Sequence, residues 1–161
     1  MLSRPIELRC GVQVPSRVAL APLTNLQSHA DGLLGDDELA FLARRADGGF
    51  GIVTTCAAYV ALDGKAWSGE LGIDRDQCLP GLTRLAARLA DAGAVGLVQL
   101  FHGGVRADQR LTGELPWSAS TWHEDTAGFV APRVATAADL ARVIEQFAAA
   151  AARAQRAAAA A

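Results

Sequence analysis

The sequence has no surplus of positive charge. Its 15 Lys and Arg residues stand against 17 Asp and Glu residues, which gives a formal net charge of −2 at pH 7. Proteins that hold nucleic acid or an anionic membrane by electrostatic attraction carry a basic patch or stripe. We therefore expect neither a nucleic acid nor a membrane among the partners of this chain.

Long uninterrupted hydrophobic runs are also missing. Residues 1–9 interleave charged side chains with single apolar ones, unlike the apolar centre of a signal peptide. The Ala-rich tract at the end is interrupted by Arg153 and Arg156, so no run reaches the roughly 18 apolar residues of a transmembrane helix. These features predict a cytoplasmic protein.

Cysteine is scarce, and neither cysteine nor histidine is arranged for metal binding. Cys10, Cys56 and Cys78 are an odd number without metal-ligand spacing, which indicates reduced thiols in a reducing compartment. The three histidines fall in separate predicted loops, so we expect no metal site. A glycine-rich dinucleotide fingerprint is missing too, because Ala-Pro-Leu-Thr-Asn follows the first predicted strand, which argues against a Rossmann fold.

The sequence does contain one repeated theme: an apolar run, a polar or glycine-rich loop, then an amphipathic helix. This alternation is typical of a parallel sheet with crossover helices. At 161 residues and 51% hydrophobic content, the chain suits one globular domain with its own core. The pattern predicts three βα units, with strands over residues 17–21, 50–54 and 95–101 and helices that begin near Asp36, Asp74 and Thr136.

Two of these helices carry a start signal in their sequence. Asp74 with Gln77, and Thr136 with Asp139, have the spacing of a capping box, in which the side chains of the two residues bond each other's backbone N–H groups. We therefore expect both pairs to cap helix N-termini.

Two further segments lie outside the three units. Alternating apolar and polar residues around a turn at Cys10 and Gly11 predict a small antiparallel hairpin before the first strand. Residues 148–161 are mostly alanine, which predicts a helical tail of uncertain origin.

Gln99 is the sharpest candidate for ligand binding. Ligands in parallel βα folds bind at the C-terminal ends of the strands. Gln99 interrupts an apolar run near such an end, and by the two-residue period it shares a face with Leu97 and Phe101. A carboxamide donates and accepts together, as the edge of a uracil-like ring requires. On spacing alone, Gln99 is either a ligand contact or a core amide that the protein itself satisfies.

Other residues expected at the strand ends have ordinary structural interpretations as well. Thr24 fits a turn or capping hydroxyl. Cys56 fits a small buried hydrophobic residue, because no neighbouring cation argues for a lowered pKa. His102 could be a base, but no nucleophile or carboxylate partner is evident, which favours an imidazole that anchors a loop.

Several segments, in this order, resemble the old yellow enzyme family. They are Ala21–Thr24, Arg44–Ala46 with Gly48–Gly51, Leu71–Ile73, and Val98–Gly104. The predicted hairpin is similar too, since this family caps the base of its barrel with one. The resemblance covers nearly all of this chain but less than half of a family member.

The resemblance implies an α/β fold of the (β/α)8 TIM-barrel type, with residues 1–161 as the N-terminal part of one FMN-binding domain. The FMN would be bound non-covalently, and donors at its pyrimidine edge would stabilise the charge that the ring gains on reduction. The implied flavin contacts are the backbone around Ala21, Pro22, Leu23 and Thr24, the Thr24 hydroxyl, the Ala57 backbone and the Gln99 carboxamide. Phe101 and His102 would line the substrate side.

The implied reaction passes a hydride from NAD(P)H through the flavin to an activated alkene of the enone type. The family's substrate-binding His/Asn pair and proton-donor tyrosine are expected beyond this chain, because no fourth strand follows Arg156. Leu26 and Cys56 stand where some members place a tyrosine and a glutamate. We expect a truncated chain that acts with a complementary barrel fragment or as a homo-oligomer.

Two other functions stay open at this point. One is a non-catalytic βα module whose Ala-rich helix docks onto a partner. The other is a barrel enzyme without flavin, which would need a catalytic acid or base near Thr24, Cys56 or His102.

Overall fold

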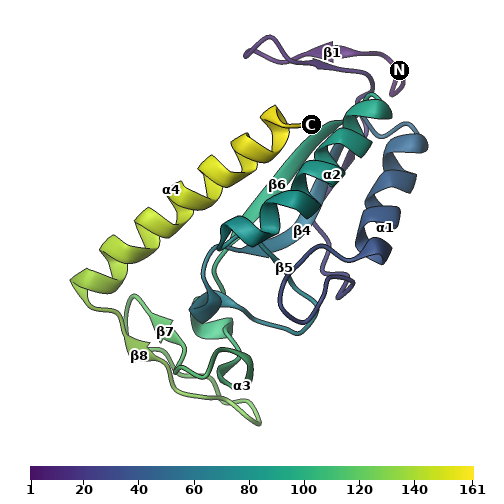
Figure 1. Ribbon diagram of the computed structural model, residues 1–161. Helices are drawn as coiled ribbons and strands as arrows, with labels where there is room; N and C mark the ends of the chain where they lie inside the picture. Colours follow the sequence, from purple (N-terminus) through teal and green to yellow (C-terminus); the bar gives the residue numbers. More distant parts are fainter.

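A hairpin opens the chain in the computed structural model, which describes residues 1–161 (Figure 1). In it β1 (Ile6–Glu7) pairs antiparallel with β2 (Gln13–Val14). Gly11 in the turn has a φ of +84°, a left-handed conformation that glycine adopts without steric cost. The predicted hairpin is confirmed.

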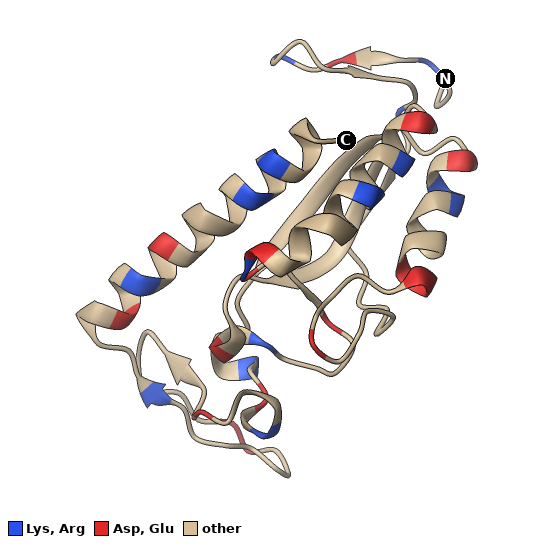
Figure 2. Ribbon diagram, in the orientation of Figure 1, with Lys and Arg blue, Asp and Glu red and all other residues tan.

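A four-stranded parallel sheet forms the centre of the molecule. Its strands are β3 (Ala19–Leu20), β4 (Ile52–Tyr59), β5 (Leu71–Gly72) and β6 (Val95–Phe101). β6 pairs with β4 along its length, whereas β3 and β5 pair with opposite ends of β4 and therefore share its other edge. None of the four strands carries a charged residue, and Figure 2 shows the charges on the helices and loops around them. The outer edge of β6 has no partner strand, so the sheet is open.

Three helices supply the core that covers one face of this sheet (Figure 1). They are α1 (Asp36–Asp47), α2 (Leu79–Asp91) and α4 (Ala137–Ala159). In α2, Leu82, Leu85 and Leu89 are at most 4% exposed, as the leucine spacing predicts. Val98 and Leu100 of β6 pack against the same core, so the alternate β6 residues face the other way.

The Ala-rich tract continues α4 almost to the end of the chain. Ala150 and Ala157 are 0% and 3% exposed and belong to the core, where small side chains allow close approach of the helix. No helix combines the length and the apolar character needed to cross a membrane. The tract is therefore a packed helix.

The connections contain short elements that the sequence pattern did not indicate. Before α2 lie η1 (Leu62–Gly64) and η2 (Asp76–Cys78). The predicted loop over residues 103–135 contains η3 (Gly104–Arg106), α3 (Gln109–Thr112), β7 (Trp117–Ser118) and β8 (Arg133–Val134). β7 and β8 pair in parallel and form a small sheet beyond the main one.

Some predicted boundaries are wrong. The strand predicted over 50–54 extends to Tyr59, so Ala57 lies inside β4 instead of following it, and the first strand is confined to Ala19–Leu20. The capping box at Asp74 does not form: α2 begins at Leu79, with Pro80 in its first turn, where proline's fixed φ suits a helix start. The box at Thr136 is confirmed.

Candidate functional site

Ala57 and Gln99 lie opposite each other on neighbouring strands. Ala57 of β4 and Gln99 of β6 are direct partners in the parallel register, in the C-terminal half of both strands. Ala57 is 7% exposed, whereas Gln99 is exposed. Leu97, on the same face of β6 as Gln99, is 48% exposed. The part of this face that β6 forms is therefore open, and the Gln99 carboxamide is not a satisfied core amide.

The segment Ala21–Thr24 continues beyond the end of β3 on the same side of the sheet. Because β3 and β4 are parallel and Leu20 pairs with Val53, the segment extends in the direction of Ala57. Leu23 is 53% exposed, and Ala21 and Thr24 are exposed as well. The structure thus leaves backbone and a hydroxyl group of this segment accessible at the same end of the sheet as Gln99.

These residues fit the ring of a flavin. A carboxamide supplies a donor and an acceptor for the pyrimidine edge, a hydroxyl supplies a further donor, and alanine leaves room for a flat ring to approach the backbone. None of the predicted contact residues is cationic, so they fit the ring and not the phosphate of FMN.

Phe101 and Trp67 form an aromatic pair beside these residues. Phe101 shares the face of β6 with Gln99, and its ring centroid lies 5.5 Å from that of Trp67, with the planes tilted by 44°. The indole Nε1 of Trp67 is buried without a hydrogen-bond partner. Trp67 precedes β5 in a segment that the sequence pattern places only in a loop, so no periodic signal identifies it.

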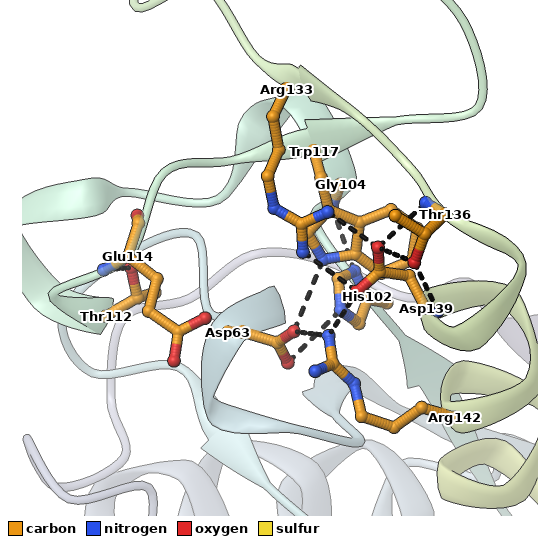
Figure 3. A network of polar contacts seen from close by, with 10 residues as sticks. All are labelled: Asp63, His102, Gly104, Thr112, Glu114, Trp117, Arg133, Thr136, Asp139 and Arg142. Carbon is orange, nitrogen blue, oxygen red and sulfur yellow. Dashed lines mark hydrogen bonds and ion pairs between the residues drawn. The ribbon is translucent and has the colours of Figure 1, made fainter.

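His102 lies in a polar network with Asp63, Trp117 and Arg142 (Figure 3). Its side chain is 6% exposed, its Nδ1 accepts a bond from the Gly104 N–H at 3.0 Å, and its Nε2 lies 3.4 Å from Asp63 Oδ1. The last contact lacks hydrogen-bond geometry. Trp117 stacks on the imidazole at 4.8 Å between centroids. The carboxylate partner that the sequence does not reveal is Asp63.

Asp63 joins this network to α4. Its Oδ2 accepts bonds from Trp117 Nε1 at 3.3 Å and from the Arg142 guanidinium at 2.9 Å (Figure 3). His102, followed by Trp117 and Arg142, lowers the pKa of Asp63. Arg142 also reaches Asp139, 3.2 Å away. The network thus fastens the end of β6 and the segment over 103–135 to the start of α4.

Cys56 points toward the helices. Its thiol donates to Glu38 Oε1 at 2.8 Å, and the Ser28 hydroxyl donates to the other oxygen of the same carboxylate. Cys56 and Glu38 are 2% and 0% exposed. Burial, together with Glu38, raises the pKa of Cys56, so this thiol is a structural group, as its sequence context indicates.

A second buried carboxylate, Glu70, holds the loop that carries Trp67. Its Oε2 accepts from the Ala66 N–H at 2.7 Å, whereas its Oε1 is buried without a partner. Glu70 is 0% exposed, and burial raises its pKa to about 7. Lys65 is also buried, and its Nζ donates to the Ala30 carbonyl at 2.5 Å.

Fold and site together define part of a parallel βα barrel, with the exposed Gln99 near the C-terminal ends of its strands. Residues 1–160 match the NADH:flavin oxidoreductase / NADH oxidase family. The chain belongs to this family, and the family expected from the sequence motifs is confirmed.

Curated relatives extend well beyond this chain. A probable NADH-dependent flavin oxidoreductase of Bacillus subtilis, YqiG, is 36% identical over 110 residues, which is 68% of this chain and 29% of the relative. The NADH:acrylate oxidoreductase of Vibrio harveyi is 34% identical over 116 residues, or 71% of this chain and 12% of the relative. The chain thus spans less than a third of either protein.

Solved structures show the same fold. A 2-naphthoyl-CoA reductase superimposes with a TM-score of 0.92 at 24% identity, over 98% of this chain and 26% of that protein. The old yellow enzyme homologue from Zymomonas mobilis gives a TM-score of 0.87 at 22% identity, over 98% of this chain and 46% of that protein. The predicted TIM-barrel fold class is confirmed, with this chain as a part of the barrel.

Proposed function

We propose that this chain supplies the flavin-ring side of an FMN-dependent oxidoreductase that passes a hydride from NAD(P)H to an activated alkene. The observation that carries the proposal is the exposed Gln99 carboxamide opposite Ala57, on the open face of a parallel sheet. Family membership supports the cofactor assignment. Bound FMN supplies the hydride relay between the two substrates.

In this function, the residues of this chain bind and orient the flavin ring. Gln99 donates to and accepts from the pyrimidine edge, and Thr24 donates a hydrogen bond to a ring carbonyl. The backbone of Ala21, Pro22 and Leu23, and that of Ala57, lies against the ring. Donors fixed in place before reduction stabilise the charge that develops there.

The substrate side lies next to Phe101. Phe101, backed by Trp67, offers an apolar wall beside Gln99. His102, which the sequence motifs placed on this side, does not line it, because its imidazole is buried beside Asp63 and Trp117. An enone-type alkene is the proposed substrate class, and relatives named as acrylate and fumarate oxidoreductases support activated alkenes in general.

We propose that residues 1–161 form one part of a single barrel domain, completed by further polypeptide. The unpaired edge of β6 adjoins an apolar cleft of about 340 Å³ between β6, α2 and α4. Leucines of α2 and alanines of α4 line it. A complementary barrel fragment that adds strands at this edge would fill the cleft, and a second copy of the chain is the alternative occupant. The cytoplasm is the proposed location.

Reconstitution tests this function. The chain is co-purified with the part of the Bacillus subtilis relative that lies beyond the matched region, and bound flavin and enone-dependent NAD(P)H oxidation are measured. We expect a yellow complex that oxidises NAD(P)H faster when the enone is present. Complex formation without flavin would contradict the proposal and favour a non-catalytic assembly module.

A further inference from the structure

A β-bulge lies directly beside the proposed ring contact. In the register of β4 and β6, Thr54 pairs with Leu97, and Ala57 is the next β4 residue to pair, with Gln99. Thr55 and Cys56 therefore together oppose the single β6 residue Val98. Bulges re-aim side chains and occur often next to active sites.

The side chain of Thr55 holds this bulge. The Gln99 N–H donates to Thr55 Oγ1 at 3.3 Å, and the same hydroxyl donates to the Cys56 carbonyl at 2.7 Å. Thr55 is 1% exposed, so water does not compete for these bonds. A side-chain oxygen thus replaces the backbone acceptor that a regular ladder would offer to Gln99.

The extra residue decides what lies opposite Gln99. With regular pairing from Thr54 and Leu97 onward, Gln99 would face Cys56. The bulge instead brings Ala57 opposite Gln99 and leaves the Cys56 thiol directed at Glu38, 2.8 Å away. Because successive strand residues point to opposite faces, a one-residue change of register here exchanges the side chain that the ring would meet.

We propose that Thr55 is a positioning residue of the ring site: its hydroxyl fixes the bulge and the backbone of Gln99, and through them the carboxamide. The effect of Thr55 on a flavin ring rests on the proposed function, whereas its effect on the bulge and on the Gln99 backbone does not. It concerns a buried residue that touches neither flavin nor substrate.

Amide hydrogen exchange tests the geometry in the ligand-free, full 161-residue chain. Thr55→Val keeps the shape and removes the hydroxyl, Thr55→Ser keeps the hydroxyl, and Thr54→Val is a matched control on the neighbouring, half-buried threonine. Thr55→Val removes one hydrogen bond to the Gln99 N–H. We therefore expect the Gln99 amide to exchange about fivefold faster in this variant than in the wild type. We expect Thr55→Ser and Thr54→Val to match the wild type. Equal Gln99 exchange in Thr55→Val and the wild type would overturn the proposal.

The flavin midpoint potential in the reconstituted complex tests the consequence. A looser carboxamide stabilises the reduced ring less, so Thr55→Val should lower the potential, and Thr55→Ser should restore it. Faster exchange with an unchanged potential would show a merely structural threonine and overturn the positioning role. If the wild-type complex binds no flavin, the proposed function fails, and the exchange result alone decides the geometry.

Discussion

Glu70 gives the chain a pH dependence of folding that can be worked out from its surroundings. The carboxyl is 0% exposed, one of its oxygens has no partner, and burial raises its pKa from 4.5 to about 7. Each pKa unit corresponds to about 1.4 kcal/mol, so ionised Glu70 weakens folding by on the order of 3 kcal/mol.

The sign follows from proton linkage. Below pH 4.5 Glu70 is protonated in both the folded and the unfolded chain, and its contribution to stability is fully present. As the pH rises to about 7, the unfolded chain ionises first, so stability falls across this window. Asp63 and Asp139, whose pKa values are lowered, have the opposite sign: their contribution to stability is present above their usual pKa of 3.8 and is lost only as the pH falls below it.

Urea unfolding at a series of pH values from 4.5 to 8 measures this effect. Glu70→Gln keeps acceptors for the loop N–H groups but cannot ionise, so its stability should change less with pH and should equal or exceed that of the wild type at pH 8. Glu145→Gln, at an exposed position of α4, is the control and should follow the wild type. The same pH slope in Glu70→Gln and the wild type would refute the reasoning.

Three further predictions concern the core, a helix end and the thiols. Leu85→Ala should lower the free energy of unfolding by about 2–5 kcal/mol, whereas Leu140→Ala, at a 45% exposed position, should change it by less than about 0.5 kcal/mol; similar losses would contradict the assigned core. Thr136→Ala removes the capping bond to the Asp139 N–H and should cost about 1 kcal/mol in the same urea assay, and an unchanged midpoint would contradict the cap. A chromogenic thiol reagent should modify only Cys10 in the native chain, because the other two thiols are buried and have raised pKa values, and rapid release of more than one equivalent would contradict this.

The sequence pattern predicts the central layers of the fold well, because hydrophobic periodicity there coincides with burial; in α4 it does not, since Leu140 and Ile144 are 45% and 68% exposed. The leucines of α2 and the apolar run of β6 are found where periodicity places them. Strand ends are harder to predict, because residues 55–59 are as apolar as the strand before them and carry no stop signal. The spacing of a capping box does not by itself place a helix start either. Asp74 and Gln77 have that spacing, yet α2, with Pro80 in its first turn, begins four residues later than the pair suggests.

Only the part of the candidate site that lies on a strand could be predicted from the sequence. Gln99 could be singled out because a polar residue interrupts an apolar strand. The partners of His102 and Cys56 could not, since Asp63 and Glu38 lie 39 and 18 residues away in sequence and meet them only through tertiary packing. The bulge at Thr55 is likewise invisible, because it depends on the pairing of β4 with a strand about 40 residues further on.

The FMN dissociation constant of the reconstituted complex tests the central claim most directly. Gln99→Ala removes the carboxamide from the open face, and Gln155→Ala removes one from an exposed position on α4. Loss of hydrogen bonds worth about 1–1.5 kcal/mol predicts affinity about tenfold weaker for Gln99→Ala and unchanged affinity for Gln155→Ala. Equal FMN affinity in Gln99→Ala and the wild type would contradict the assignment of this face as the flavin-ring site.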